Sequence, residues 1–228
     1  EEKSEKTTTP NYSKEYVTKP AFLDAAGDVD GKDVLEIGCG EGYWLRLLHD
    51  QGANCTGIDR AASQIEKARE NTCEDITFIH GDAASQRLDG FDLVFLQNVL
   101  LEIEHLEQIH DVLRTASAAL HDEGRLIIND LHPCVAHFEY DNLEQGEDYA
   151  YFRSGSTVKI VSKRVNDDDV VYVDYHWTLE DLVSAITGAG FTITTIKEPK
   201  PSQDVLDETP YLAYREHTPY NILFEARV

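Results

Sequence analysis

Short apolar runs alternate with helical patterns along most of this chain, and that alternation limits the fold more than any other feature of the sequence. The apolar and β-branched runs predict strands at 33–37, 54–58, 76–79, 91–96 and 124–129. Other segments space their apolar residues as helices do, at 11–26, 44–52, 61–70 and 100–120. Because each strand-like run is almost entirely apolar, we expect a parallel sheet with both faces covered by helices.

Residues 131–177 interrupt this alternation and contain no convincing amphipathic helix. Within them the pattern predicts an acidic loop at 141–148 and two β-rich runs, 157–164 and 170–175, joined by an Asn/Asp turn at 166–169. A helix then begins with a capping-type start at Thr178, and two final strands are expected at 191–196 and 220–228. We therefore expect a hairpin-containing insertion after the fifth strand, acting as a lid or a substrate-binding element.

Length and composition indicate one large domain. The 228 residues, 41% of them hydrophobic, suffice for a substantial core, and we assign 11–228 to it. Residues 1–10 are polar, lack the apolar core of an export signal and are expected to form a disordered tail. No apolar run approaches the ~20 residues of a membrane span. The four cysteines lack zinc-ligand spacing, so we expect a cytoplasmic protein with reduced thiols. Either a monomer or a homodimer is expected.

The chain is strongly acidic, and this charge bears on its partners. It has 43 Asp and Glu against 20 Lys and Arg, for a net charge of −23. Such a surface repels nucleic-acid phosphates and anionic lipid headgroups, so neither nucleic acid nor membrane is an expected partner. Salt relieves the repulsion between like charges, so we also expect a salt-tolerant protein.

A glycine-rich turn joins the first expected strand to the helix that follows it. Gly38, Gly40 and Gly42 let the backbone turn sharply and let a ligand approach main-chain atoms without a Cβ in the way. The following helix points its amino-terminal N–H groups at the same place. Asp59 ends the second strand, where a carboxylate can bind both ribose hydroxyls of a nucleoside. Together these features predict a nucleoside-binding site.

The residues around the turn indicate which nucleoside it binds. A dinucleotide site would need a third glycine where Tyr43 stands, and no phosphate-binding loop ending in Gly-Lys-Ser/Thr is present. An acid, Glu36, precedes the turn. It would repel a pyrophosphate but suits an ammonium and a sulfonium group. The charges therefore favour S-adenosylmethionine over an anionic cofactor.

With these motifs the chain resembles the class I S-adenosylmethionine-dependent methyltransferases over roughly 34–228. The segment 34–42 resembles that family's first motif throughout, and Gly57-Ile58-Asp59 matches its acidic second-strand position. Further resemblances follow in order along the chain at 81–83, 91–100, 124–128 and 178–191. The resemblance implies an α/β fold: a seven-stranded, mostly parallel, doubly wound sheet with an antiparallel last strand and helices on both faces.

The resemblance also implies which residues bind S-adenosylmethionine. Asp82 would contact the adenine, and Gln97 or Asn98 the methionine moiety. Tyr12 and Tyr16 would form either an N-terminal lid over the cofactor or aromatic packing against the core. The implied cofactor-binding residues are Tyr12, Tyr16, Glu36, Gly38, Cys39, Gly40, Asp59, Arg60, Asp82, Ala83, Gln97 and Asn98.

The acceptor side is less defined by the sequence. The candidate catalytic residues are His132, just past the fifth strand, and His176, at the return from the insertion; each is either a general base or a structural histidine. Arg153 and Arg215 are either clamps for an acidic acceptor or exposed ion-pair partners. The acids at 167–169 are interpreted as a solvated turn, so no metal is expected.

These observations predict an enzyme that methylates an O, N or C nucleophile of a small molecule. Two alternatives remain: a methyltransferase acting on RNA or protein, and a non-catalytic module that binds S-adenosylmethionine. A basic stripe along the carboxyl edge of the sheet would favour RNA. An acceptor pocket sealed by bulky side chains would favour the non-catalytic module.

Overall fold

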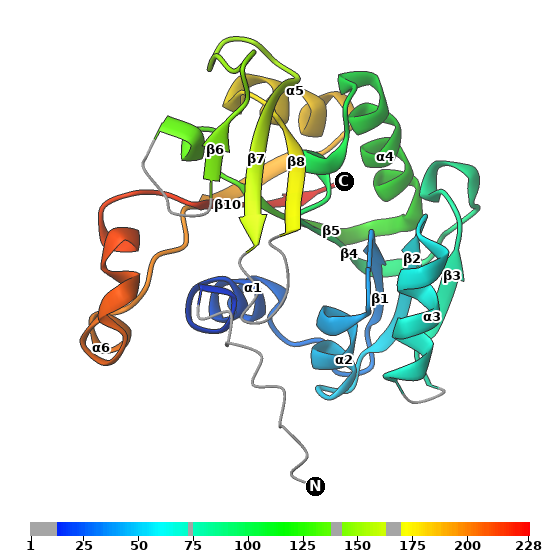
Figure 1. Ribbon diagram of the computed structural model, residues 1–228. Coiled ribbons are helices and arrows are strands. Elements are labelled where there is room, and N and C mark those ends of the chain that lie inside the picture. Colours follow the sequence, from blue (N-terminus) through cyan, green and yellow to red (C-terminus); the bar gives the residue numbers. More distant parts are fainter. Residues whose placement is uncertain (1–12, 73–74, 138–142, 163–169) are drawn as a thin grey trace, which may run out of the picture.

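A computed structural model describes residues 13–72, 75–137, 143–162 and 170–228. Within these residues the main sheet has seven strands in the order β3-β2-β1-β4-β5-β10-β9 (Figure 1). The strands are β1 (Asp33–Ile37), β2 (Asn54–Asp59), β3 (Thr77–His80), β4 (Phe91–Gln97), β5 (Leu120–Leu131), β9 (Thr192–Lys197) and β10 (Asn221–Arg227). β1 to β5 pair in parallel, and β10 is antiparallel to both neighbours. The expected sheet and its antiparallel last strand are confirmed.

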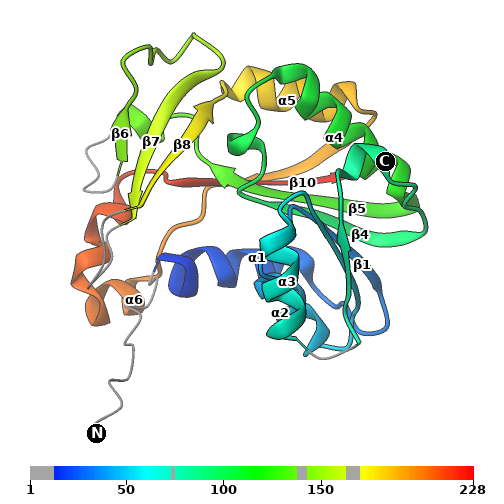
Figure 2. The same cartoon turned by 45° about the vertical axis from the view of Figure 1, so that its right-hand side comes forward.

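Helices cover both faces of the main sheet (Figure 2). One face carries α1 (Lys19–Ala26), α2 (Tyr43–His49) and α3 (Ala62–Glu70); the other carries α4 (Leu106–Ala119) and α5 (Leu179–Gly188). Successive side chains of a strand point to opposite faces. On β1, for example, Val34 packs with α1 to α3, whereas Leu35 packs with α4 and α5. Two apolar cores therefore hold the strand ends in fixed positions.

The insertion at 131–177 forms a second, antiparallel sheet whose described strands follow the order β6-β7-β8. β7 (Ser156–Ser162) and β8 (Val170–His176) pair as the expected hairpin, while the turn expected at 166–169 lies outside the described residues. The acidic loop expected at 141–148 contains a short strand, β6 (Leu143–Gln145), because the buried Leu143 pairs with Ile160 of β7. A 3-10 turn, η4 (Val135–His137), precedes this sheet.

The single helix expected at 100–120 is divided in the structure. A 3-10 turn, η3 (Leu100–Glu102), precedes α4. The N–H groups of Leu100 and Leu101 donate to the buried Asp130 carboxylate, at 2.9 and 3.3 Å. Trp177 Nε1 donates to Leu100 O at 3.2 Å. These bonds hold η3 against β5 and the insertion, so it does not continue into α4.

Four further elements differ from the expected pattern or extend it. β5 begins at Leu120 rather than at the expected 124, because Leu120 pairs with Phe91 of β4. Between β9 and β10 lie α6 (Gln203–Glu208) and the 3-10 helix η5 (Pro210–Glu216), which the sequence pattern does not indicate. At the amino end a π-helical turn, η1 (Lys14–Thr18), continues into α1 and agrees with the helical pattern at 11–26.

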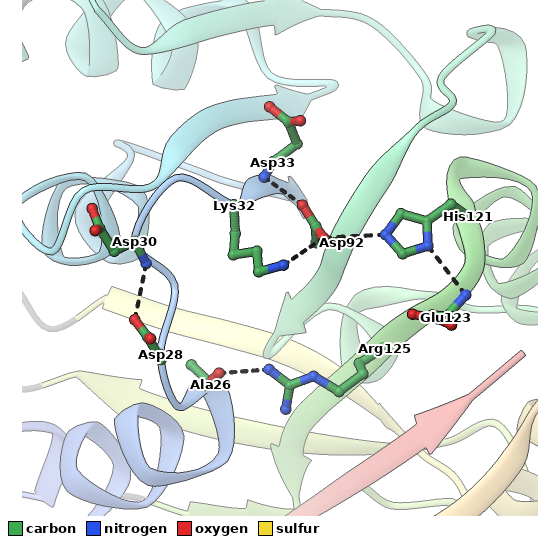
Figure 3. Close-up of polar contacts among 9 residues, drawn as sticks. All are labelled: Ala26, Asp28, Asp30, Lys32, Asp33, Asp92, His121, Glu123 and Arg125. Carbon is green, nitrogen blue, oxygen red and sulfur yellow. Dashed lines mark hydrogen bonds and ion pairs between the residues drawn. The ribbon is translucent and has the colours of Figure 1, made fainter.

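Polar contacts stabilise the amino-terminal edge of the main sheet, meaning the side where its parallel strands begin (Figure 3). The Asp92 carboxylate accepts from the Asp33 N–H at 2.9 Å, from Lys32 Nζ at 3.2 Å and from His121 Nε2 at 3.1 Å. The Arg125 guanidinium donates to two carbonyl oxygens at the end of α1, at 3.0 and 2.6 Å. These partners connect β1, β4, β5 and α1 at the edge opposite the carboxyl ends of the parallel strands.

Candidate active site

A cavity of about 670 Å³ opens at the carboxyl ends of β1, β2 and β4. Strand-end side chains and the backbone N–H groups of the following turns meet at this edge of a parallel sheet. Most of the cofactor-binding residues implied by the resemblance line this cavity: Glu36, Gly38, Cys39, Gly40, Asp59, Arg60, Asp82, Ala83, Gln97 and Asn98. The fold thus brings together residues from four separate segments of the chain.

The N-terminal contribution to the cavity differs from the expected one. Tyr12 lies outside the described residues, and Tyr16 is 44% exposed and is not among the lining side chains. Lys14 of η1 lines the cavity instead, with Nζ 3.3 Å from the centroid of the Tyr43 ring. Burial lowers the pKa of Lys14. No sequence motif indicates Lys14, so only the structure reveals that its side chain lines the cavity.

The turn between β1 and α2 places main-chain atoms at the cavity surface. Gly38 and Gly40 have positive φ angles of 74° and 50°. A Cβ at Gly38 would lie 2.6 Å from Val99 Cγ2, whereas one at Gly40 would meet no described atom within 4 Å. Close packing therefore requires glycine at position 38, and the open side of Gly40 leaves its backbone accessible to a ligand.

Asp59 joins the glycine turn to the end of β2. Its Oδ2 accepts from the Gly40 N–H and its Oδ1 from the Ala61 N–H, both at 2.8 Å. Each carboxylate oxygen has a second lone pair, so these bonds leave acceptor capacity for a ligand hydroxyl. Asp59 therefore both fixes the turn and lines the cavity.

Glu36 lies beneath the turn and is 1% exposed. Its Oε2 has no hydrogen-bond partner in the described part of the chain. Burial raises the pKa of Glu36 well above its ordinary 4.5; the Lys14 ammonium opposes this shift and the Asp59 carboxylate adds to it. A bound cation would favour the ionised form of Glu36, so this position selects for positive charge.

Asp82, just after β3, lines the cavity on the side where that strand ends. Its carboxylate accepts from the Ala84 N–H at 3.0 Å and caps a 3-10 turn, η2 (Ala83–Ser85). The Gly81 N–H donates to Asp59 O at 2.9 Å. The ends of β2 and β3 are thereby joined, so Asp59 and Asp82 keep a fixed separation along the cavity wall.

The end of β4 carries Gln97 and Asn98. Asn98 has a φ of 56°, a left-handed conformation that few residues other than glycine adopt, and its N–H donates to Asn129 O at 2.8 Å. Backbone strain of this kind gathers at ligand sites. The side-chain amide of Gln97 is buried and lacks a hydrogen-bond partner among the described residues.

His132 and His176 lie elsewhere. Of the described residues that line the large cavity, none is a histidine. His132 and His176 instead line a separate cavity of about 30 Å³, together with the buried Asp130 and Asp174. That volume matches about one water molecule, so the small cavity is too small for an organic acceptor.

Both imidazoles are held by structural contacts. His132 Nδ1 accepts from the Cys134 N–H at 3.0 Å, and its Nε2 lies 3.0 Å from Glu198 Oε1. His176 Nε2 lies 2.7 Å from Tyr151 O, to which it donates. Burial lowers the pKa of both histidines, despite the opposing effects of Glu198 and of the Tyr151 carbonyl. These contacts favour the structural alternative for both residues.

The two arginines differ from each other. Arg153 is exposed and donates to the Asp148 carbonyl oxygen at 3.4 Å. Arg215 is only 3% exposed, so its interpretation as a solvated ion-pair partner is wrong. Its guanidinium hydrogen-bonds to Ser13 Oγ, donates to Asn221 Oδ1 at 3.3 Å and stacks 4.0 Å from the centroid of the Tyr220 ring. Arg215 is thus a buried cation near the carboxyl end of β5 and the amino end of the antiparallel β10.

The described residues contain neither a cluster suited to a metal ion nor a helix suited to a membrane. No group of three or more His, Cys, Asp and Glu side chains there is arranged to hold a metal ion, and 167–169 lie outside them. No helix in that part of the chain has the length and apolar composition needed to cross a membrane.

The chain is similar in sequence to proteins of known family. The family model described as "Methyltransferase domain" matches residues 12–196. The mitochondrial ubiquinone biosynthesis O-methyltransferase of Schizosaccharomyces pombe is 32% identical over 108 residues, 44% of this chain and 38% of the relative. The Vibrio campbellii ubiquinone biosynthesis O-methyltransferase is 29% identical over 116 residues, 48% of each chain. The chain spans about half the length of the curated relatives it matches.

Solved structures share its fold. An S-adenosylmethionine-dependent methyltransferase from Mesorhizobium loti has a TM-score of 0.71 at 23% identity, covering 92% of this chain and 96% of its own. A putative one from Listeria monocytogenes has a TM-score of 0.70 at 20% identity, covering 92% and 95%. The family match covers most of this chain, and the sequence motifs agree with it. The chain therefore belongs to the methyltransferase-domain family, among the class I S-adenosylmethionine-dependent methyltransferases.

Proposed function

We propose that this protein transfers a methyl group from S-adenosylmethionine to a small-molecule acceptor. The observation that carries the proposal is the buried Glu36 carboxyl beneath an open glycine turn, in a cavity of about 670 Å³. Cavities of ~300–1,000 Å³ are typical of small-ligand sites. When bound, S-adenosylmethionine supplies an electrophilic methyl group on a cationic sulfur.

The lining residues suit each polar part of such a cofactor. Glu36 would accept hydrogen bonds from the ammonium group, and Lys14 would pair with the carboxylate. Asp59 would accept from the ribose hydroxyls and Asp82 from the adenine amino group. The unpartnered Glu36 Oε2 supports this fit, since a buried carboxyl with a free acceptor atom is stabilised by a cationic donor.

The protein's main tasks in such a reaction are alignment and exclusion of water. Methyl transfer from a sulfonium is an in-line displacement, so the acceptor atom must be held on the line of the breaking bond. The Gly38–Val99 packing and the left-handed Asn98 fix the cavity wall where β1 and β4 end. Because no described histidine lines this wall, we assign His132 and His176 a structural role rather than a role in proton transfer.

A small molecule is the acceptor class that the observations support. The curated relatives carry the name ubiquinone biosynthesis O-methyltransferase. The net charge of −23 disfavours RNA, which is the main alternative. We also propose one cytoplasmic domain, monomeric or homodimeric, in which the 131–177 insertion acts as a lid or as a substrate-binding element. A non-catalytic module that binds S-adenosylmethionine is the remaining alternative.

Two measurements test the proposal. Calorimetry should detect S-adenosylhomocysteine binding to the wild-type protein, with much weaker binding to Glu36→Gln. A screen of small metabolites with labelled methyl donor should then give a methylated product. Absence of binding at millimolar ligand would contradict the whole proposal. Binding without any labelled small-molecule, RNA or protein product would favour the non-catalytic module.

A further inference from the structure

One carboxyl group in the large cavity has no role in the proposed binding of S-adenosylmethionine. Glu102 is the last residue of η3 and lines the cavity together with Asn98 and Val99 of the same segment. Within 13–72, 75–137, 143–162 and 170–228, no hydrogen bond or ion pair joins its carboxyl to another residue. Glu102 is therefore available to a molecule bound in the cavity.

The other side chains of the cavity that could accept a proton are engaged. Glu41 Oε1 pairs with Lys67 Nζ at 2.9 Å, and Asp111 forms an ion pair within α4. Burial raises the pKa of the Cys39 thiol, so this group stays protonated at neutral pH. Of the described carboxyls that line the cavity and are not assigned to the cofactor, Glu102 alone lacks a partner.

The 3-10 turn η3 forms the wall between the two cavities of the site. Leu100 and Leu101 line the small cavity, whereas Val99 and Glu102 line the large one. The hydrogen bonds from η3 to the buried Asp130 carboxylate fix this arrangement. Glu102 thus presents its side chain to the large cavity from a backbone segment that is held in place.

The charges around Glu102 come from both sides of η3. Glu102 is exposed in the open cavity, yet partial burial of its carboxyl raises its pKa above the ordinary 4.5; the Asp59 carboxylate adds to the shift and the Arg60 guanidinium opposes it. Asp130 and Asp174 face η3 from the small cavity, and burial raises the pKa of each to about 7. A carboxylate with a raised pKa is a stronger base than an ordinary one.

We propose that Glu102 is the general base of the reaction, and that the acceptor presents a neutral hydroxyl or a protonated amine to the methyl group. The inference rests on the proposed function and names a catalytic residue and the acceptor chemistry of the same site. An ionised carboxylate at this position binds such a group through its proton and repels an anionic one.

The proton and the electron pair move in opposite directions in this step. The proton of the acceptor passes to a Glu102 carboxylate oxygen and then to water. The acceptor oxygen or nitrogen forms its bond to the methyl carbon, and the bond between that carbon and sulfur breaks. Its electron pair stays on the sulfur, which becomes a neutral thioether.

Sinefungin tests where the Glu102 carboxyl lies. In this analogue an amine-bearing carbon replaces the methylated sulfur, so a cationic amine occupies the position of the transferred methyl group. Calorimetry at pH 8 should show that the wild type binds sinefungin about tenfold more tightly than S-adenosylhomocysteine, because a charged hydrogen bond is added. Glu102→Gln should lose this preference and keep its affinity for S-adenosylhomocysteine.

Glu41→Gln is the matched control for this measurement. Glu41 also lines the cavity, and the substitution is chemically the same, but its carboxylate pairs with Lys67. The variant should keep the wild-type preference for sinefungin. A preference that is lost equally in both variants would reflect the general charge of the cavity and would overturn the inference.

The preference for sinefungin should also depend on pH. The ionised Glu102 pairs with the amine, so the preference is present above the raised pKa of Glu102 and is lost as pH falls through it. Glu102→Gln retains the neighbouring Asp59, Arg60, Asp130 and Asp174. A pH-dependent preference that persists in this variant would assign it to one of those neighbours and would overturn the inference.

The rate of methyl transfer supplies a second readout. With an acceptor identified by the labelled-donor screen, Glu102→Gln should lower kcat about 100-fold or more, as expected for loss of a general base, while KM for S-adenosylmethionine is unchanged. An unchanged kcat would contradict the assignment of Glu102 as the base.

The outcomes separate the two proposals. If the wild type binds neither S-adenosylhomocysteine nor sinefungin, the proposed function fails first. If it binds both, and Glu102→Gln keeps the wild-type preference for sinefungin, the inference about Glu102 is overturned and the methyltransferase proposal stands.

Discussion

The two edges of the main sheet treat their polar groups in opposite ways. At the amino-terminal edge, Asp92 has three hydrogen-bond partners and Arg125 donates to two carbonyl oxygens (Figure 3). At the carboxyl edge, Glu36, Gln97 and Asn129 are buried and carry atoms without partners in the described residues. The polar groups of the first edge contribute to stability, and our proposed function assigns the unpartnered groups of the second edge to a ligand.

The energetic contrast between the edges is substantial. A buried polar group that loses its partner destabilises the folded state by about 1–3 kcal/mol, whereas a partnered one stabilises it by about 1 kcal/mol. Removing the charge of the unpartnered Glu36 should therefore raise stability, whereas removing the charge of the partnered Asp92 should lower it. These substitutions should affect ligand binding at the carboxyl edge alone.

The largest effect is expected for Glu36→Gln. Removing the charge should weaken S-adenosylhomocysteine binding about 10- to 100-fold, because a hydrogen bond to a charged group contributes about 1.5–3 kcal/mol. Calorimetry measures this change. Wild-type affinity in the variant would place the ligand's ammonium elsewhere.

The stability of the same variant should change in the opposite direction. The raised pKa of Glu36 means that its contribution to stability is present below the ordinary pKa of 4.5 and is lost as pH rises through the raised value. Glu36→Gln should therefore melt above the wild type at neutral pH, with the difference shrinking toward acid pH. A variant that melts lower across this range would contradict the comparison of the edges.

Asp59→Ala is expected to have the next largest effect. It removes the carboxylate that holds the Gly40 N–H and lines the cavity, so S-adenosylhomocysteine affinity should fall about tenfold or more. His132→Ala, whose side chain lies outside that cavity, serves as the control and should leave the affinity unchanged. Equal losses in the two variants would remove the distinction between the cavity and the His132 region.

Asp92→Asn tests the amino-terminal edge. The free energy of unfolding should fall by about 1–2 kcal/mol in urea titrations, with S-adenosylhomocysteine affinity unchanged. Burial raises the pKa of Asp92, but hydrogen bonds from the Asp33 N–H, His121 and Lys32 together lower it below its ordinary 3.8. The Asp92 contribution should thus be present above pH 3.8 and be lost as pH falls through the lowered pKa. A loss of affinity in this variant would show that the edges are coupled.

The smallest effect is expected from salt. The net charge of −23 is spread over the surface, so molar KCl should raise the melting temperature by a few degrees through screening. An uncharged osmolyte at equal osmolality is the control. A melting temperature that does not rise with KCl would contradict the expected salt tolerance.

Local sequence signals predict most of the fold and most of the residues that line the large cavity. Strand periodicity located the main sheet, and the glycines with Glu36 and Asp59 located the cavity, because each signal lies within one strand and its following turn. Contacts between distant residues were not predictable in this way. The Asp130 carboxylate separates η3 from α4 across a long sequence distance, and no local pattern reports that bond.

The acceptor side shows the same limit more strongly. Their chemistry and position in the chain make His132 and His176 candidates, yet tertiary contacts with Glu198 and Tyr151 hold them away from the cavity. Asn129 appears in the sequence as one polar residue at the end of an apolar strand. Its burial without a hydrogen-bond partner among the described residues is a property of the packed structure.

Proton release on ligand binding tests the central claim most directly. S-adenosylhomocysteine binding is measured by calorimetry between pH 5 and 8 in pairs of buffers with different ionisation enthalpies, for the wild type and Glu36→Gln. If the Glu36 carboxyl binds the cationic group of the ligand, Glu36 should lose its proton on binding. The wild type should then release a proton at pH values between 4.5 and the raised pKa of Glu36, and the variant should release none. Equal heats in both buffers for the wild type, or equal release from the variant, would contradict the account.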